Sequence, residues 1–195
     1  TNQAILVGNA MIKNLKTTDT DELYVVMRNV LGKDEVFEVS AAYGTVDNFA
    51  HFVGVANGTY NRFLVDYIDV KQLHINANYD RKINNIISVM ANVDYYNWDK
   101  EVYHKPNFKA SLSAPVDLRG KIKVTPSLSY IGERATSVMS KLPTQIHVNL
   151  GFYYSYTQNI SAYVQLNNLT DSKQDMWRDH REVGFNGLFG LNYSF

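Results

Sequence analysis

Residues 185–195, the last eleven of the chain, constrain its fold more than any other stretch. Alternate positions separate into an apolar and aromatic set, and a small and mostly polar set. The first set is Phe185, Gly187, Phe189, Leu191, Tyr193 and Phe195, and the second is Asn186, Leu188, Gly190, Asn192 and Ser194. A period of two residues indicates a β-strand. A strand with one oily and one polar row is typical of a membrane β-barrel, in which lipid lies outside and water or polar groups lie inside.

The same alternation recurs upstream and predicts an outward row and a lumenal row in each strand. The outward rows are Phe37/Val39/Ala41/Tyr43, Leu73/Ile75/Ala77/Tyr79, Ile87/Val89/Ala91/Val93/Tyr95, Phe108/Ala110/Leu112, Ile122/Val124/Leu128/Tyr130, Ile146/Val148/Leu150/Phe152/Tyr154/Tyr156 and Ile160/Ala162/Val164/Leu166. The opposite rows are mainly polar, and we expect Asn149, Gln165, Asn167, Lys121 and Lys123 to face the lumen. Residues 3–12, 22–31 and 50–57 also read as strands, although the assignment of their faces is less clear.

The expected fold class is therefore all-β: an antiparallel meander transmembrane β-barrel with about eleven strands in this chain. Tight connections are predicted near residues 46–48, 80–82, 115–120 and 157–159. Longer connections are predicted near residues 58–71, 97–105, 132–143 and 170–181. Short periplasmic turns and longer external loops are the rule in bacterial outer-membrane barrels.

With that orientation, the outward aromatic residues form two girdles, as expected at the two membrane interfaces. The girdle expected at the short-turn rim is Tyr43, Tyr79, Tyr154, Tyr156, Tyr193 and Phe195, and the one at the opposite rim is Tyr95, Phe108, Tyr130 and Phe185. A soluble β-sandwich or lipocalin-type barrel also alternates, but its polar row faces water and usually carries many Lys and Glu. Residues 142–170 contain no acidic or basic side chain except one histidine. As a membrane helix, that stretch would place amides in hydrocarbon, whereas a barrel places them inside.

Composition excludes several classes of function. The net charge is zero, which gives no argument for a nucleic-acid partner. The absence of cysteine excludes a disulfide framework and a thiolate metal site. The five histidines show no metal-binding spacing, and no nucleophile motif is present, so we expect no cofactor, no metal and no enzymatic activity.

The last ninety residues resemble the end of a TonB-dependent outer-membrane receptor. The resemblance rests on an ordered set of short motifs. These are His104-Lys105-Pro106-Asn107 before a strand, Tyr130-Ile131-Gly132-Glu133-Arg134, Leu142-Pro143 before the next strand, Leu166-Asn167-Asn168-Leu169-Thr170-Asp171, and the terminal run 184–195 that ends in Phe195. Upstream of about residue 85 only generic barrel strands are visible.

This resemblance implies a 22-strand barrel with an N-terminal plug domain and a TonB-binding segment. Residues 1–195 would then be the C-terminal half of the barrel, without the plug. About eleven strands is an odd number and would leave two unpaired edges in lipid, so we expect the first strands to pair with another part of the protein. The implied partners are outer-membrane lipid, the remaining strands and plug, the TonB system and the barrel-insertion machinery of a Gram-negative bacterium. The implied function is uptake of a scarce nutrient: a siderophore, haem, cobalamin or a glycan. The alternatives are a scaffold barrel or porin without energy-coupled import.

Two sets of residues are candidates for specific roles. Trp177, Arg178, Asp179 and His180 form a dense polar cluster in a predicted external loop, where residues that bind ligands are often found. The ordinary alternative is a solvated loop end with an interfacial Trp. Phe185, Phe189, Leu191, Tyr193 and Phe195 form the outward row of the last strand, which by resemblance is the signal for assembly; Phe195 could instead be an interfacial anchor only.

Overall fold

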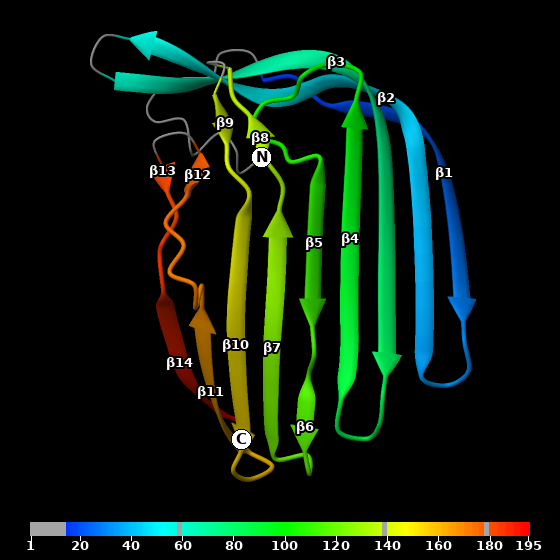
Figure 1. Cartoon of the computed structure of the whole chain (residues 1–195), viewed down its shortest axis with the longest axis vertical. Coiled ribbons are helices and arrows are strands. Elements are labelled where there is room, and N and C mark those ends of the chain that lie inside the picture. Colours follow the sequence, from blue (N-terminus) through cyan, green and yellow to red (C-terminus); the bar gives the residue numbers. More distant parts are fainter. Residues whose placement is uncertain (1–14, 58–59, 138–139, 178–179) are drawn as a thin grey trace.

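The computed structural model describes residues 15–57, 60–137, 140–177 and 180–195. The predicted strand at residues 3–12 lies outside this part of the chain. Within it, every regular element is a β-strand, and no helix is long and apolar enough to cross a membrane. The main sheet is an antiparallel meander in the order β1-β2-β3-β4-β5-β7-β10-β11-β14, with β6 paired to β7 (Figure 1).

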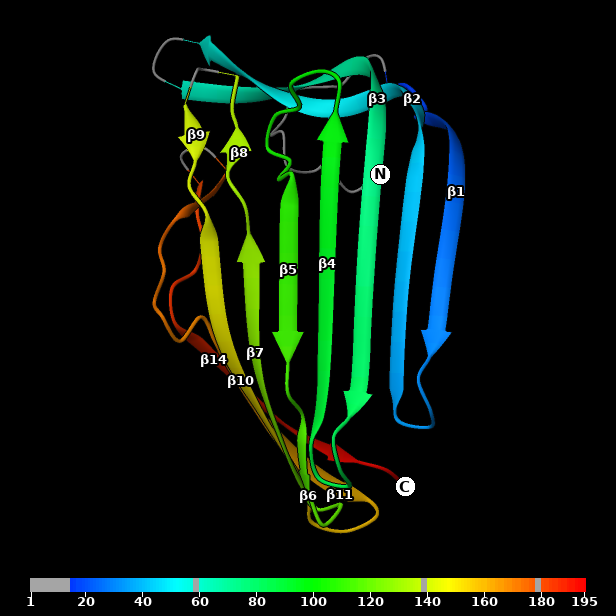
Figure 2. The ribbon, with the colours of Figure 1, turned by 45° about the vertical axis from the view of Figure 1, so that its right-hand side comes forward.

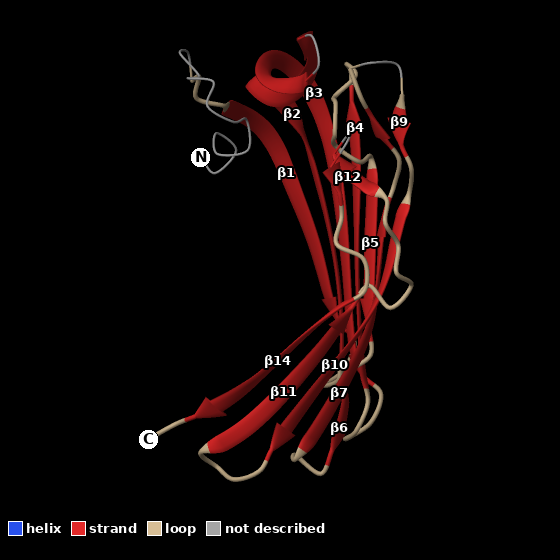
Figure 3. Cartoon of the chain, turned by 90° about the vertical axis from the view of Figure 1, so that its left-hand side faces the viewer, coloured by secondary structure: helices blue, strands red, loops and turns tan. Residues whose placement is uncertain are grey.

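The strands of the main sheet are β1 (Asp19–Val30), β2 (Glu35–Asn57), β3 (Tyr60–Lys82), β4 (Ser88–Trp98), β5 (Phe108–Ser113), β6 (Val116–Leu118), β7 (Ile122–Ile131), β10 (Gln145–Ser155), β11 (Ile160–Asn167) and β14 (Asn186–Tyr193). Two small hairpins complete the fold: β8 (Arg134–Ala135) with β9 (Lys141–Leu142), and β12 (Asp175–Trp177) with β13 (His180–Arg181). The sheet curls, and its two edge strands, β1 and β14, come round to the same side (Figure 3).

Register carries the outward and lumenal rows continuously from strand to strand. One outward row runs through Met27, Val39, Ala77, Val93, Ala110, Tyr130 and Ile146, each paired with the next. The adjacent lumenal row runs through Arg28, Glu38, Asn78, Asn92, Ser111, Ser129 and His147. Because side chains alternate across a strand, this register confirms that the predicted apolar and polar rows lie on opposite faces.

The distribution of apolar side chains is the reverse of that in a soluble domain. Outward residues are open across the sheet; Ile146 is 48% exposed and Leu191 is 82% exposed. Buried apolar residues are few, and the cluster of Val46, Val70 and Val102 lies at one end of the sheet, against Phe49, Ile68 and Trp98. A broad apolar face without a protein layer over it fits a wall that meets lipid.

Connections alternate in length, as predicted, except between β2 and β3, where β2 ends at Asn57 and β3 begins at Tyr60. The short-turn end carries residues 31–34, 83–87, 119–121 and 156–159, and the long-loop end carries the other connections (Figure 2). One predicted turn is wrong. Residues 46–48 form an irregularity inside β2, where the register shifts between Val46 and Phe49, and Asn48 has a φ of 53°. The predicted strand at 50–57 is therefore the upper half of β2, and most of the predicted loop at 58–71 is β3.

Because of this error, the sequence analysis assigned Tyr43 to the wrong aromatic girdle. Tyr43 pairs with Leu73, which pairs with Asn97 near the end of β4. Tyr43 therefore lies on the long-loop side, one step from the row that contains Tyr95 and Phe108, and not at the short-turn rim. The pair of Phe108 and Tyr130 supports the long-loop girdle, with ring centroids 5.7 Å apart at 70°.

Candidate ligand-contact layer at the long-loop end

Four segments gather at the long-loop end of the sheet. They are the upper half of the β2–β3 hairpin, the loop 99–107, the β8–β9 hairpin and the segment 168–185 that contains β12 and β13. Figures 1 and 2 show the hairpin lying across the top of the sheet, above the ends of the other strands. We call these segments the external layer. Their positions bring together polar and aromatic side chains that are far apart in sequence.

Arg134 joins the β8–β9 hairpin to the segment 168–185. Its side chain is buried, and its guanidinium donates to the carbonyl oxygens of Met176 (3.1 Å), Asp175 (3.3 Å) and Pro143 (3.4 Å). Burial lowers the pKa of Arg134, and the negative charge of Glu182 opposes that effect. Gln145, also buried, donates to the Asp175 carbonyl as well (3.4 Å). These donors hold β12 against the barrel wall, because each satisfies a backbone acceptor that is removed from water.

A cluster of aromatic and histidine rings lies beside this anchor. Trp177 stacks on His104 with centroids 4.7 Å apart and meets Phe52 edge-on at 4.7 Å. His51 stacks on Tyr103 at 5.1 Å, and its Nε2 lies 3.4 Å from Asp66 Oδ2. Burial lowers the pKa of His104 to about 4, so this ring is neutral at neutral pH.

Segment 168–185 is held to the wall at both of its ends. His147 Nε2, on the lumenal face of β10, lies 2.7 Å from Glu182 Oε2, and the two side chains are 17% and 6% exposed. Asn168 has a φ of 51°, and its side-chain amide donates to the carbonyls of Ser172 (2.7 Å) and Val183 (3.2 Å). The Phe185 amide donates to Asp171 Oδ1 (2.9 Å), and this bond lowers the pKa of Asp171.

These contacts give physical roles to two of the motifs that carry the resemblance. In Asn168-Leu169-Thr170-Asp171, Asn168 and Asp171 close the loop on itself. In Tyr130-Ile131-Gly132-Glu133-Arg134, the Gly132 amide donates to the Phe108 carbonyl (2.9 Å), and a Cβ at Gly132 would lie only 3.1 Å from that oxygen. Both motifs therefore position the external layer.

The structure places the predicted loop cluster in part. Trp177 packs inward against His104 and Phe52. Arg178 and Asp179 lie outside the described residues, and His180 is described only by its backbone pairing with Trp177. Binding of a ligand by these four residues stays a prediction. Sequence reasoning did not find His51, His104, Arg134 and Glu182 as a group, because no spacing relates them; the Tyr-x-Gly-x-Arg motif was the one signal for Arg134.

Below the external layer, the lumenal face divides into two parts. On β3 and β4, polar side chains satisfy one another: Asp94 Oδ1 accepts from Asn76 (2.9 Å) and lies 2.9 Å from His74 Nε2, and the chain of amides continues through Asn78 (2.6 Å) and Asn92 (2.7 Å). On β7, β10, β11 and β14, a hollow of about 650 Å³ is lined by polar and aromatic groups that include Lys123, Tyr153, Tyr163, Gln165 and Asn167. His74 and His147 both face the lumen.

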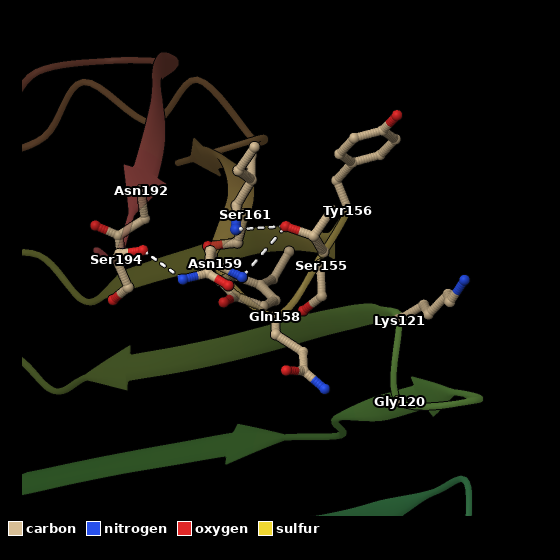
Figure 4. A pocket seen from close by; sticks show the side chains of 12 residues that line it. Gly120, Lys121, Ser155, Tyr156, Gln158, Asn159, Ser161, Asn192 and Ser194 are labelled. Atoms are coloured by element: carbon tan, nitrogen blue, oxygen red, sulfur yellow. Dashed lines mark hydrogen bonds between the residues drawn. The ribbon is translucent and has the colours of Figure 1, made fainter.

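A second hollow, of about 530 Å³, lies at the short-turn end (Figure 4). Its walls are the turn 156–159, Lys121, Tyr153 and the end of β14. Asn159 closes one side of it by donating to the Ser194 carbonyl (2.6 Å). This contact fixes the last residues of the chain to the β10–β11 turn.

Strand β14 is an edge of the sheet, paired on one side to β11. Its outward aromatic and leucine side chains are open; those proposed as an assembly signal are Phe185, Phe189, Leu191, Tyr193 and Phe195. The structure thus presents these residues on one face, next to backbone groups that can pair with another strand.

Solved structures of TonB-dependent outer-membrane receptors have this fold. The copper transporter OprC is 14% identical, with a TM-score of 0.73 over 93% of this chain and 32% of its own. The ferric-catecholate import receptor Fiu from E. coli K12 is 14% identical, with a TM-score of 0.66 over 92% of this chain and 28% of its own. A variant of the ferric enterobactin receptor PfeA from Pseudomonas aeruginosa is 11% identical, with a TM-score of 0.71 over 93% of this chain and 32% of its own.

The chain therefore has the fold of a receptor barrel wall and spans about a third of the length of these receptors. These neighbours are transporters and receptors, not enzymes. No family model matches the sequence, and no curated protein matches it.

Proposed function

We propose that this chain is the C-terminal part of an outer-membrane receptor that binds a scarce nutrient outside the cell and imports it with energy from the TonB system. One observation carries the proposal: a sheet with an apolar outer face supports an ordered polar layer folded over its lumenal end, on the fold of import receptors. A scaffold barrel needs no such layer over its lumen. In this proposal the long-loop end faces the outside of the cell. The surface that first contacts the ligand then includes Trp177, Arg178, Asp179 and His180.

The rest of the receptor supplies what this sheet lacks. Among the described strands, β1 and β14 each have an unpaired edge, and unpaired backbone groups are not tolerated in lipid. We assign the partner strands, the plug domain and the TonB-binding segment to the remainder of the protein. The path through the described main sheet has nine strands, with β6 off it beside β7, and single-chain bacterial barrels have an even number, so the remainder must also supply an odd number of strands.

The cargo is a nutrient that is too scarce or too large for diffusion through a porin. The named neighbours carry copper, ferric catecholates and ferric enterobactin. The candidate ligands to test are iron chelates, haem, cobalamin and glycans.

The outward row of β14 serves in assembly. We propose that Phe185, Phe189, Leu191, Tyr193 and Phe195 are read by the insertion machinery through strand addition, in which main-chain pairing gives affinity and alternate side chains give selectivity. Deletion of Phe195 from the full-length protein should sharply lower its surface level and leave unfolded periplasmic intermediate. Normal surface level and normal assembly kinetics would leave Phe195 as an interfacial anchor only.

Uptake by whole cells tests the transport proposal. Cells that express the full-length gene should accumulate one member of the labelled panel, and deletion of tonB should abolish accumulation while binding at the surface persists. Accumulation that does not depend on TonB would identify a porin. No binding and no uptake of any member would favour the scaffold alternative.

A further inference from the structure

The two hollows on the lumenal face belong to one strip of the wall. The hollow of about 650 Å³ lies on β7, β10, β11 and β14, the hollow of about 530 Å³ lies at the short-turn end of the same strands, and Tyr153 lines both. Register arranges the lumenal side chains of this strip in rungs, which are Ser127/Asn149, Thr125/Gly151/Gln165/Leu188, Lys123/Tyr153/Tyr163/Gly190 and Ser155/Ser161/Asn192. Successive rungs are two residues apart along each strand, so the strip is about 20 Å long. We call this strip the lumenal track.

The polar side chains of the lumenal track keep much of their hydrogen-bonding capacity. In the described part of the chain, the side chains of Thr125, Ser127 and Gln165 form no hydrogen bond. Asn149 uses its side-chain oxygen to accept from the Asn168 amide (2.9 Å) and keeps its NH₂ group as a donor. On β3 and β4, by contrast, the amide side chains bond to one another. Amides and hydroxyls both donate and accept, so the track offers both kinds of partner to a solute.

Two tyrosines on neighbouring strands lie where the two hollows meet. Tyr153 of β10 pairs with Tyr163 of β11, and Tyr153 is 42% exposed. The Tyr163 ring lies against the bare backbone of Gly190, where a Cβ would be 2.5 Å from the ring. Next to Tyr153 along β10, a Cβ at Gly151 would meet only Thr125, at 3.7 and 3.8 Å, so the space above Gly151 is open. A tyrosine has an apolar body and a polar tip, which suits a solute with both C–H surfaces and hydroxyls.

The lumenal track carries little net charge. Lys123 pairs with Asp117 of β6 across the lumenal face, and Asp117 Oδ1 accepts from the Gly120 amide (2.8 Å). Lys121 lies at the rim, and Figure 4 shows its amine turned away from Asn159. A charged solute that leaves water requires opposite charge in its site, whereas an uncharged one requires only hydrogen-bond partners. The charge of the track therefore fits an uncharged solute.

The lumenal track also differs from a surface on which a protein domain packs. Such surfaces are apolar and aromatic at their centre. In the track the exposed aliphatic side chain that faces the lumen is Leu188, on the edge strand β14. On β1, Tyr24 and Val26 place neighbouring apolar side chains on the lumenal face, 57% and 45% exposed. A plug domain therefore has its apolar contact on β1, and the track stays open to water and solute.

We infer that the lumenal track binds a neutral, hydroxyl-rich solute of the oligosaccharide class as it passes toward the short-turn end. Gln165, Asn149 and the hydroxyls of β7 exchange hydrogen bonds with the hydroxyls of the solute. Tyr153 and Tyr163 pack against its C–H surfaces. An oligomer can occupy several rungs at once, because the rungs repeat along the strands. This inference rests on the proposed function, because it names the class of the imported ligand and the part of the wall along which that ligand passes.

Thiol labelling of the full-length receptor in lipid nanodiscs tests whether the lumenal track is open. The receptor carries one introduced cysteine, Gln165→Cys, in a background without other cysteines, and the reagent is a neutral hydrophilic maleimide. We expect Gln165→Cys to react at least about tenfold faster than Leu150→Cys, which faces lipid. Reaction of Gln165→Cys as slow as that of Leu150→Cys would show that the plug covers the track and would overturn the inference.

Protection of the same cysteine tests the class of solute. The neutral probes are maltohexaose, cellohexaose, xylohexaose and mannohexaose, and hexagalacturonate is a charged counterpart of the same length. At saturation, at least one neutral probe should slow the labelling of Gln165→Cys about tenfold, and hexagalacturonate at the same concentration should not. Protection by hexagalacturonate alone, or by none of the probes, would overturn the assigned class.

A bulky side chain in the lumenal track tests whether the solute passes along it. Gly151→Trp fills the open space beside Tyr153 and should lower the rate of uptake by whole cells about tenfold or more, at an unchanged surface level. Ser111→Trp is the matched control: Ser111 lies on the lumenal face of β5, paired with Asn92 and Ser129, and lines neither hollow. Uptake in this control should stay within about twofold of the parent. Equal losses in both variants would mean that bulk anywhere in the lumen blocks uptake, and would contradict the track.

The outcomes separate this inference from the proposed function. Protection of Gln165→Cys by a neutral probe in a receptor whose uptake does not depend on TonB would defeat the proposed function alone. TonB-dependent uptake that Gly151→Trp leaves unchanged would defeat this inference alone. If Gly151→Trp lowers the surface level, the two labelling experiments decide, because they use the receptor without that substitution.

Discussion

Replacement of Arg134 by Ala tests whether the external layer is held by the contacts seen at its base. Arg134 donates to carbonyls on β12 and next to β9, so its loss should free the β12–β13 hairpin from the wall. The Asp175 carbonyl keeps the Gln145 donor, whereas the carbonyls of Met176 and Pro143 lose the donor that Arg134 supplies. Both hydrogen bonds are part-buried; an acceptor left without its partner costs about 1–3 kcal/mol, so two cost about 2–6 kcal/mol.

Amide hydrogen exchange on the full-length receptor in a bilayer measures this cost locally. Two reporters lie in the segment: the Glu182 amide, which donates to the Gln174 carbonyl (3.0 Å), and the Phe185 amide, which donates to Asp171. A cost of about 2–6 kcal/mol lowers protection by roughly 30-fold or more, while amides in the middle of β3 and β4 should not change. Arg134→Lys should show a smaller loss, because one charged donor remains.

The control is Arg81→Ala. Arg81 is more than half exposed at the short-turn end, with Nε 3.8 Å from Glu35, and such a pair contributes little. Unchanged protection of Glu182 and Phe185 in Arg134→Ala would refute the anchoring role. A uniform loss across the sheet would also refute it, because the hairpin would then not open separately.

Three further predictions concern the wall and the layer. Leu150→Arg should destabilise the folded barrel by roughly 2–4 kcal/mol in urea titrations in vesicles, because Leu150 lies on the outward face at the middle of β10. Asn149→Arg, on the lumenal face, should destabilise it much less. Equal losses of stability would contradict the assignment of the two faces. Acidification should weaken the layer, because His104 is protonated near pH 6.5 in the unfolded chain and only near pH 4 in the folded chain. About 3 kcal/mol of folding free energy that is present above pH 6.5 is therefore lost progressively as the pH falls to 4. His104→Gln should remove that part of the pH dependence of unfolding, followed by Trp fluorescence. Gly190→Ala should lower the free energy of unfolding by about 1 kcal/mol, because its Cβ would lie 2.5 Å from the Tyr163 ring. A double-mutant cycle with Tyr163→Ala should show that the effects of the two substitutions are coupled. Additive effects would show that the ring moves aside freely.

The strands near the end of the chain could be predicted because one physical rule sets them. Between Ile146 and Phe152, each outward residue must suit lipid and each lumenal residue must suit a polar interior, so the period of two is strict. Residues 46–48 misled the prediction because Val-Asp-Asn is typical of a turn. Tertiary contacts decide otherwise: the Asn48 amide donates to Asp69 Oδ1 (2.9 Å) and Thr18 donates to the Asn48 carbonyl (3.1 Å), which stabilises a bulge within a long strand.

The external layer could not be predicted in the same way. His51, His104 and Trp177 come from β2, the loop 99–107 and β12, and their contacts depend on how far the β2–β3 hairpin bends over the sheet. Local periodicity reports which face of a strand a residue occupies, whereas the layer depends on loop paths that many distant contacts fix together.

Site-directed spin labelling along β10 tests the central claim most directly, and the absence of cysteine in this chain makes each introduced label specific within it. Labels at Ile146, Val148, Leu150 and Phe152 of the full-length receptor in bilayers should be more accessible to oxygen than to a polar nickel chelate. Labels at Asn149, Gly151 and Tyr153 should show the opposite preference, so that accessibility alternates with a period of two. Preference for the polar relaxant at the first set, or no alternation, would contradict a barrel wall with lipid on its apolar face.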